Sequence, residues 1–209
     1  MRIRSVHHRR RLKGTQRRTQ ILESAVGCFA RAGFRGTTTR DLARCCGVNE
    51  AILFRHFPTK EHLYRAILDE RLNRPVEDLY PAYPAVGGDA LFFSEIARGV
   101  VKRMEEDPLF LRVLLYSALE DHRLARDFTE RRVRRSVDYL VRFIRKRQRQ
   151  KIYRPMHPEI AARAFLGMAV HHALMTRLFL VPPRGVAREQ AIAIWVSLFL
   201  SGISKGRAG

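Results

Sequence analysis

Apolar residues recur at helical spacing in the first part of the chain. Between residues 19 and 32 they occupy positions 21, 22, 25, 28, 29 and 32, and Gly33 follows directly. This spacing gathers the apolar side chains on one face of a helix, and a glycine is well suited to end it. The pattern therefore predicts a helix over residues 19–32.

Two short helices are predicted next from their capping residues. Thr38 and Asp41 have the spacing of a capping box, in which the Thr38 hydroxyl accepts the Asp41 amide and the Asp41 carboxylate reaches back. They predict a helix over about 38–45, with Gly47 supplying the turn after it. A second short helix is expected over about 49–56.

The second short helix and the one after it also have polar residues at their starts. Asn49 is a suitable N-cap for the helix that ends near His56. Thr59 follows Pro58 and is expected to cap a helix that runs to about Arg74.

A joint and a second helical region follow. Prolines 75, 81 and 84 and the glycine pair 87–88 interrupt the pattern. The rest of the chain again has helical period, and no run shows sustained alternation of apolar and polar residues. We therefore predict an all-α protein, with further helices at about 89–105, 108–121, 124–152, 158–179 and 188–203.

The charge balance points to a polyanionic partner. The 209 residues include 40 Lys and Arg against 20 Asp and Glu, a formal net charge of +20. Such a charge favours binding to nucleic acid or to an anionic membrane surface. Basic residues occur in both halves, so charge alone does not locate the binding face. The basic block at residues 1–18 is expected to be flexible, either as a solvated tail or as an arm ordered by an anionic partner.

Several functional classes lack their sequence signals. The most apolar window, residues 191–200, is about half the ~18 residues that a membrane span needs. No secretory signal and no phosphate-loop, metalloprotease or nucleophile-elbow motif is found. We expect a cytoplasmic protein that is not an enzyme and needs no cofactor or metal.

The three cysteines fit this setting. Cys28, Cys45 and Cys46 are an odd number in a long chain, so no disulfide framework is expected. Cys45 and Cys46 are interpreted as small core residues, and redox sensing through the cysteines is the alternative.

The two short helices joined at Gly47 match the helix-turn-helix plan, in which the second helix enters the major groove. The segments GFRGTTTRDLA at 33–43, CGVN at 46–49 and LFRHFPTKEHL at 53–63 resemble the signature of TetR-family transcriptional regulators. The resemblance covers about residues 15–70. It implies a flexible basic arm at 1–14, a helix-turn-helix DNA-binding domain at 15–74 and a helical ligand-binding and dimerisation domain at 75–209.

The resemblance also implies a DNA-contact set. Threonines and an arginine at the first helix start approach phosphates, residues 49–56 form the recognition helix, and a lysine grips the backbone. The set is Thr38, Thr39, Arg40, Asn49, Glu50, Ala51, Phe54, Arg55, His56 and Lys60.

Individual roles in base recognition follow from side-chain chemistry. Arg55 is suited to bidentate pairing with a guanine, and Asn49 is suited to contact an adenine or a phosphate. Ala51 or Phe54 is suited to pack on a thymine methyl. Phe54 stands where the family usually has tyrosine, so a phosphate contact is lost. The alternative for Phe54 is core packing with Phe57.

The last two helices are predicted to form a homodimer, as a four-helix bundle about a two-fold axis. Their apolar residues fall at suitable spacing, although ordinary core packing within one chain is the alternative. The predicted interface is Ala161, Ala164, Phe165, Met168, Ile192, Trp195, Val196, Phe199, Leu200 and Ile203.

A ligand pocket is expected among the C-terminal helices, although apolar residues at this spacing are more often plain core. The candidates are Phe92, Met104, Phe110, Leu114, Tyr116, Tyr139, Phe143, Met168, His171, His172 and Met175. The adjacent histidines point about 100° apart on a helix and do not form a joint metal site.

These features predict a sequence-specific DNA-binding regulator, a homodimeric repressor that a small-molecule effector releases from a palindromic operator. The double-stranded operator, a second copy of the chain and the effector are its expected partners, and no membrane is involved. The alternatives are an activator of the same family and a charge-driven, non-specific nucleic-acid-binding protein.

Overall fold

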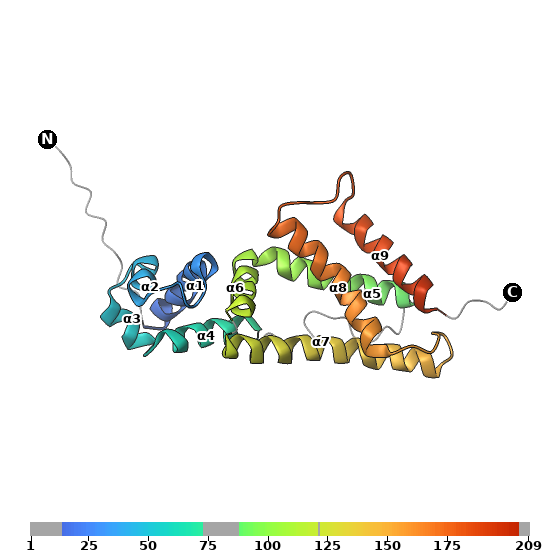
Figure 1. Ribbon diagram of the computed structural model, residues 1–209, viewed down its shortest axis with the longest axis horizontal. Coiled ribbons are helices and arrows are strands. Elements are labelled where there is room, and N and C mark those ends of the chain that lie inside the picture. Colours follow the sequence, from blue (N-terminus) through green and yellow to red (C-terminus); the bar gives the residue numbers. More distant parts are fainter. Residues whose placement is uncertain (1–13, 73–87, 121, 205–209) are drawn as a thin grey trace.

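The computed structural model describes residues 14–72, 88–120 and 122–204. Regular structure in these ranges is helical, apart from one isolated antiparallel bridge between Tyr153 and Ser204, so the all-α prediction is confirmed. In chain order the helices are α1 (Gly14–Ala32), α2 (Thr39–Cys46), α3 (Glu50–His56), α4 (Lys60–Leu72), α5 (Gly88–Glu106), α6 (Pro108–Leu119), α7 (Arg123–Arg149), α8 (Pro158–Arg177) and α9 (Arg188–Ile203) (Figure 1).

The predicted caps of the helix-turn-helix are present. The Thr38 hydroxyl accepts the Asp41 amide at 3.1 Å, and the Asp41 carboxylate accepts the Thr38 amide at 3.2 Å. Gly47 ends α2 in the left-handed conformation, with φ 64°. The Asn49 side chain accepts the Ile52 amide at 2.8 Å at the start of α3. These bonds satisfy helix-end groups that would otherwise lack partners.

Two predicted helix ends differ from the observed ends by three residues or more. The first helix begins at Gly14 rather than at residue 19. The additional residues extend it by more than one turn, but they are basic and polar and so continue no apolar pattern. In this turn Arg17 donates to the Gln20 side chain at 2.8 Å, and the Arg18 guanidinium lies 4.9 Å from the centre of the Phe57 ring. The seventh helix ends at residue 149 rather than 152. Lys151 has φ 60°, a left-handed conformation that a right-handed helix does not contain.

Other sequence predictions fall partly outside the described residues. The Thr59 hydroxyl accepts the His62 amide at 3.2 Å, so the predicted cap of α4 is confirmed. The predicted end of this helix near Arg74, the prolines of the joint with Gly87, and residues 1–13 of the basic arm lie outside the described ranges. Gly88, the last residue of the predicted joint, begins α5.

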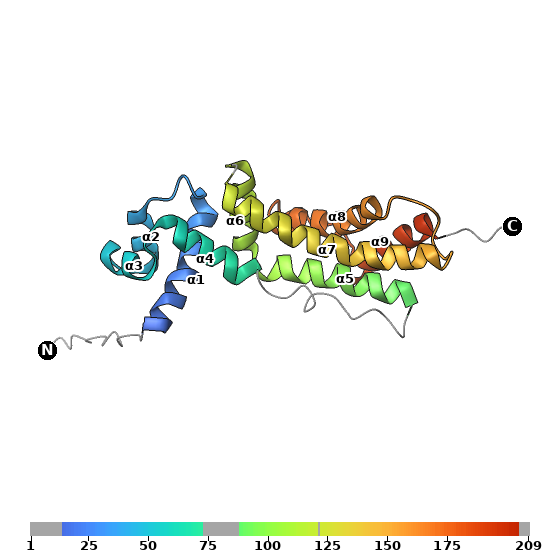
Figure 2. The ribbon, with the colours of Figure 1, turned by 90° about the horizontal axis from the view of Figure 1, so that it is seen from below.

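The helices form two parts along an elongated molecule. Helices α1–α4 make one end and α5 with α7–α9 the other, and α6 lies between them (Figures 1 and 2). Helix α6 packs against α1, α5 lies against both α8 and α9, and α7 lies against α8. The DNA-binding candidates and the predicted dimer helices are therefore at opposite ends of the molecule.

Each part has its own hydrophobic core. The N-terminal core includes fully buried Phe29 and Leu42, and two residues of α6, Phe110 and Val113, complete it. In the C-terminal core Phe93 is fully buried, and the nearby aromatic rings come from α5, α7, α8 and α9. Fully burying one such side chain stabilises the fold by about 1.5–3 kcal/mol.

Side chains of α6 cap the end of α1. The Arg112 guanidinium donates to the Ala30 carbonyl at 2.9 Å, and the Tyr116 hydroxyl donates to the Arg31 carbonyl at 3.0 Å. The last carbonyls of a helix have no partner within it. The DNA-binding part is thus hydrogen-bonded to the C-terminal part at a defined place.

The turn after α1 is hydrogen-bonded to the C-terminal end of α6. The Glu120 carboxylate accepts the backbone amides of Phe34 at 2.9 Å and Arg35 at 3.1 Å. Gly33, with φ 71°, brings the turn this close. His122 packs edge-on against the Phe34 ring, and its burial lowers the pKa of the imidazole below 6.5.

One expectation about the cysteines is corrected. Cys28 of α1 and Cys45 of α2 form a disulfide, with their Cα atoms 6.5 Å apart, whereas Cys46 is free and buried. The odd cysteine count excluded only a complete pairing. The packing of α1 on α2 brings one pair together, so Cys45 is not a plain core residue.

Candidate nucleic-acid interface and effector cavity

Helix α3 presents a mixed surface at the tip of the molecule. Ala51, Phe54 and Arg55 are exposed, whereas Leu53 on the opposite side is buried in the N-terminal core. Phe54 is 38% exposed and Phe57 only 3%, so the alternative of core packing fits Phe57 and not Phe54. An arginine beside an aromatic ring and a methyl group supplies both hydrogen-bonding and apolar contacts to base edges.

The start of α2 is held to α3 by polar side chains. The Thr39 hydroxyl donates to the Glu50 carboxylate at 2.8 Å. The Thr38 hydroxyl is bonded to Asp41 and holds the pKa of that carboxyl below its usual value. Both threonine hydroxyls thus order the frame, and Arg40 is exposed beside them.

Of the predicted DNA contacts, Lys60 has hydrogen-bond partners within the chain, and His56 is partly enclosed by it. The Lys60 ammonium donates to the carbonyls of Phe34 at 2.8 Å and Thr37 at 3.0 Å, and it lies 4.2 Å from the centre of the Phe34 ring. Lys60 therefore closes the turn before α2. His56 is half-buried with Nε2 shielded from solvent, and burial lowers its pKa. Its side chain is less available than that of Arg55.

A cavity of about 280 Å³ lies between α4, α5, α6 and α7. Three arginines and two carboxylates share its wall with apolar side chains. Its lining is Arg71, Arg103, Met104, Glu106, Asp107, Phe110, Leu111, Leu114 and Arg132.

The structure distributes the predicted pocket residues over several places in the fold. Met104, Phe110 and Leu114 line this cavity, but the other eight candidates do not. The remaining residues lie in the core, at the junction between the two parts, on the surface or near α9. Similar apolar spacing occurs on helices that face in different directions, so spacing alone does not show which residues meet. Phe92, Tyr139 and Phe143 stack together in the C-terminal part, Tyr116 binds α1, Met168 lies near the α8–α9 surface, His171 is exposed, His172 packs on Trp195 and Met175 is half-buried.

The predicted dimer surface is corrected as well. Most of its residues belong to the core of their own chain, because this face of α8 and α9 packs against α5 and α7. Ala161, Phe165, Ile192, Val196, Phe199 and Ile203 are buried, Met168, Trp195 and Leu200 are packed against the same core, and Ala164 is exposed.

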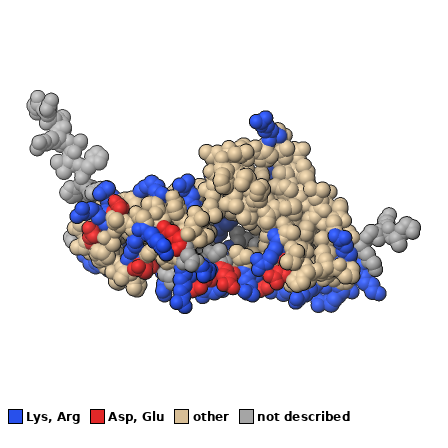
Figure 3. All heavy atoms as spheres, viewed as in Figure 1, with Lys and Arg blue, Asp and Glu red and all other residues tan. Residues whose placement is uncertain are grey.

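A second apolar face of α8 and α9 is exposed. Ile160 is 63% exposed, Ile194 46% and Leu198 65%. A groove of about 500 Å³ runs between the two helices there, and Ala164 and Gly202 help to line it. In Figure 3 the surface over α8 and α9 carries few charged residues, whereas Lys and Arg gather along the edge formed by α7. The predicted interface included Ala164 and Met168 of this groove but not the exposed Ile160, Ile194 and Leu198 of this face, although apolar residues all around α9 were a signal for them.

Two kinds of feature were not found in the described ranges. No group of three or more metal-ligating side chains is found among the described residues. None of the described helices has the length and apolar character required to span a membrane.

Both parts of the chain match known families. Residues 21–67 match "Bacterial regulatory proteins, tetR family", and residues 95–202 of the 209 match "AefR-like transcriptional repressor, C-terminal domain". The chain belongs to the TetR family. This TetR-family protein is a DNA-binding transcriptional regulator, and its family is not enzymatic, as the sequence predicted.

A curated relative is similar to the DNA-binding domain. The transcriptional repressor KstR2 of Rhodococcus jostii is 36% identical over 75 residues, which cover 36% of this chain and 35% of KstR2. The match thus spans about a third of the length of that relative, and it carries no information about the effector of this TetR-family regulator.

Solved structures share the fold over nearly the whole chain. The ketosteroid regulator KstR2 of Mycobacterium tuberculosis has a TM-score of 0.67 at 20% identity, covering 92% of this chain and 97% of its own. AibR, solved with isovaleryl coenzyme A and operator DNA, has a TM-score of 0.64 at 22% identity, covering 87% and 97%. These likenesses concern the fold alone.

Proposed function

We propose that this TetR-family regulator is a homodimeric repressor that reads a two-fold symmetric operator through α3. The observation that carries the proposal is the exposed group Ala51, Phe54 and Arg55 on a helix whose frame is fixed by caps at both ends. Arg55 pairs with a guanine and Phe54 packs on a thymine methyl. Arg40 approaches the phosphate backbone from the start of α2.

The exposed face of α8 and α9 supports the dimer. Ile160, Ile194 and Leu198 are large apolar side chains that α8 and α9 present to water, and a second copy of the same face covers them. The two recognition helices of such a dimer lie about 34–36 Å apart, one turn of DNA. Five of the ten residues that spacing predicted for the interface line the groove on this face, namely Ala161, Ala164, Met168, Phe199 and Ile203. The exposed Ile160, Ile194 and Leu198 are added to them.

The cavity between α4 and α7 supports an anionic effector with an apolar part. Arg71, Arg103 and Arg132 outnumber Glu106 and Asp107 in its wall, and the rest of the lining is apolar. Its volume of about 280 Å³ suits a small organic anion rather than a whole coenzyme. AibR, with its acyl-thioester ligand, is a precedent in this fold for a partly apolar, charged ligand.

Contacts from the cavity to α4 support release of DNA by the effector. Arg71 of α4 forms an ion pair with Asp107, the N-cap of α6, and Arg103 donates to the Arg71 carbonyl at 3.1 Å. An anion that draws these arginines away from their present partners shifts α4, and α4 supports the helix-turn-helix. Coupling between two such sites is typically ~1–3 kcal/mol.

Selection of random-sequence duplexes by the purified protein at physiological salt tests the DNA-binding proposal. We expect a two-fold symmetric motif, and we expect Arg55→Ala to lose about 1–3 kcal/mol of discrimination at one base pair of each half-site. Arg145→Ala, an exposed arginine on α7, is the control and keeps the motif. Binding that depends only on salt, with no motif, would indicate the non-specific alternative. A motif near genes whose transcription rises with the protein would indicate an activator.

Melting experiments with octanoate as the probe anion test the effector proposal. We expect octanoate, at about 100 times its dissociation constant, to stabilise the protein by about 2.7 kcal/mol and to weaken binding to the selected duplex. Arg103→Gln removes one cavity cation and reduces both responses, whereas Arg145→Gln retains them. Equal responses in Arg103→Gln and the wild type would exclude this cavity as the site.

A further inference from the structure

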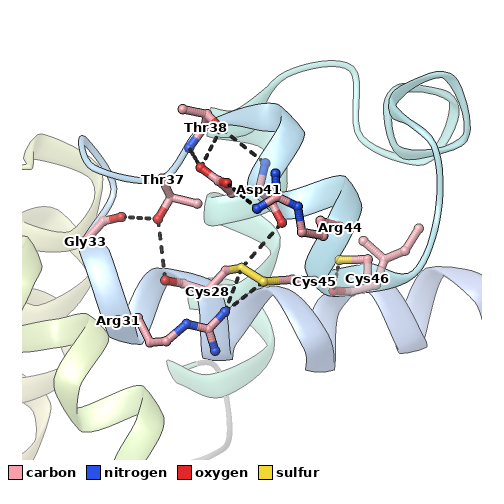
Figure 4. The surroundings of a disulfide bond; sticks show 10 residues. Cys28, Arg31, Gly33, Thr37, Thr38, Asp41, Arg44, Cys45 and Cys46 are labelled. Atoms are coloured by element: carbon pink, nitrogen blue, oxygen red, sulfur yellow. Dashed lines mark hydrogen bonds and ion pairs between the residues drawn. A yellow bond between two sulfur atoms is a disulfide. The ribbon is translucent and has the colours of Figure 1, made fainter.

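The disulfide between α1 and α2 has an unusual charged neighbour. The Arg31 guanidinium places Nη2 2.9 Å from Cys45 Sγ and 3.3 Å from Cys28 Sγ (Figure 4). A neutral disulfide is a weak acceptor and has little need of a cation. A reduced pair of cysteines does benefit from a cation, because a guanidinium beside a sulfur favours the reactive thiolate. The arrangement therefore suits the reduced pair as well as the bonded one.

The same two cysteines border a hollow at the protein surface. The hollow has a volume of about 260 Å³, and its wall includes Arg31, Arg44 and Asp41. The Asp41 carboxylate in this wall is bonded to Thr38, and it lies 3.6 Å from the Arg44 guanidinium. Because the wall has two arginines and one carboxylate, it carries a net positive charge.

The two paired cysteines differ in exposure. Both line the hollow, but Cys28 is only 4% exposed, whereas Cys45 is half-buried. Cys45 is therefore the sulfur that a reagent in the hollow meets first, and Cys28 is placed to complete the bond.

The third cysteine is a natural control. Cys46 is adjacent to Cys45 in sequence but faces the N-terminal core, where its thiol donates to the Ile21 carbonyl at 3.6 Å. Burial raises the pKa of the Cys46 thiol to about 11, so it remains protonated and unreactive at neutral pH. Two neighbouring cysteines thus have opposite environments.

We propose that Cys28 and Cys45 form a reversible oxidation site for hydroperoxides, with Arg31 as the residue that activates it. The Cys45 thiolate attacks one peroxide oxygen, the O–O bond breaks, and a sulfenic acid and hydroxide form. The Cys28 thiol then displaces water from the sulfenic acid and forms the disulfide. In total two thiols lose two electrons and two protons, and one hydrogen peroxide becomes two waters. A small dithiol reverses the change by exchange.

The bond lies where it affects the DNA-contact frame. It ties α1 to the end of α2, and the start of α2 carries Thr38, Thr39 and Arg40. Oxidation restricts α2 before DNA arrives, so less ordering is required on binding. The oxidised protein therefore binds its operator more tightly than the reduced protein. This consequence rests on the proposed DNA binding, whereas the thiol chemistry does not.

The chemistry is tested on the full-length protein, reduced with dithiothreitol, desalted and treated with hydrogen peroxide. We expect the free thiols to fall from three to one, with the mass loss of two hydrogens. Oxidation should raise the melting temperature by about 5–10 °C. Cys46→Ala keeps both responses, and Cys45→Ser loses both. A wild-type protein that retains three thiols would overturn the proposed site.

The role of Arg31 is tested by the rate of oxidation as a function of pH. Arg31→Ala should require higher pH for the same rate, about tenfold slower at neutral pH for each unit by which the thiol pKa rises. Arg31→Lys should restore most of the rate. A rate profile unchanged in Arg31→Ala would remove the activating role.

The consequence for DNA is tested with the selected duplex. We expect oxidised wild type and oxidised Cys46→Ala to bind it about three- to tenfold more tightly than their reduced forms. Cys45→Ser should show one affinity under both conditions. Equal affinities of oxidised and reduced wild type would overturn the coupling, whereas absence of binding in both states would contradict the proposed DNA recognition and leave the thiol result standing.

Discussion

We expect Leu198→Asp to produce a monomer and to weaken binding to the selected operator by about 100-fold or more. Leu198 is 65% exposed on the apolar face of α8 and α9. Two copies of the face place carboxylates in a desolvated interface, which charged groups without partners oppose strongly. A monomer then binds one half-site at a time and loses the gain from linked binding. Light scattering measures the mass, and fluorescence anisotropy measures the affinity.

The control for this variant is another exposed leucine. Leu119 at the end of α6 is 84% exposed and lies outside the α8–α9 face, so Leu119→Asp should remain a dimer with unchanged affinity. Circular dichroism checks that each variant is folded. If Leu198→Asp remains a dimer at every concentration, the partner surface is elsewhere on the chain.

Gly33→Ala should lower the free energy of unfolding by about 2–4 kcal/mol. Gly33 has φ 71°, a region that costs other residues energy. A Cβ there would lie 2.2 Å from Glu120 Oε1 and 3.0 Å from a Tyr116 ring carbon. The carboxylate must move, and its bonds to the amides of Phe34 and Arg35 break. Urea denaturation measures the loss.

Gly27 in the middle of α1 provides the opposite expectation. A Cβ at this position meets only the end of the Arg31 side chain, at 3.9 Å. Gly27→Ala should therefore stabilise the protein by about 0.5–1 kcal/mol through helix propensity. Equal effects of the two alanines would show that the approach of Glu120 to the turn contributes nothing to stability.

Local signals explain why the DNA-binding part could be predicted well. The capping box of Thr38 and Asp41, the left-handed Gly47 and the N-cap Asn49 act within a few residues, so the sequence carries them directly. The resemblance to the TetR family rests on the same short-range features. The exposure of Phe54 was open in the sequence, because α3 is too short for a clear apolar period.

The errors concern contacts between distant segments. The sequence contains the cysteines, but only the packing of α1 on α2 shows that Cys28 meets Cys45. Glu120 is an ordinary charged residue until α6 brings its carboxylate to Phe34. Neither pairing has a periodicity or motif from which it could be found.

The sequence by itself determined the helical class, the helix-turn-helix and its caps, because these depend on the spacing of apolar residues and on hydrogen bonds close along the chain. Only the tertiary structure decided which apolar face of α9 forms the core and which remains open, since both faces carry apolar residues. It also decided that Arg71, Arg103 and Arg132 share one cavity, because they come from three different helices. The proposed function depends on both kinds of information: local order builds the helix proposed to read DNA, and long-range packing places the surfaces proposed for the partner and the effector.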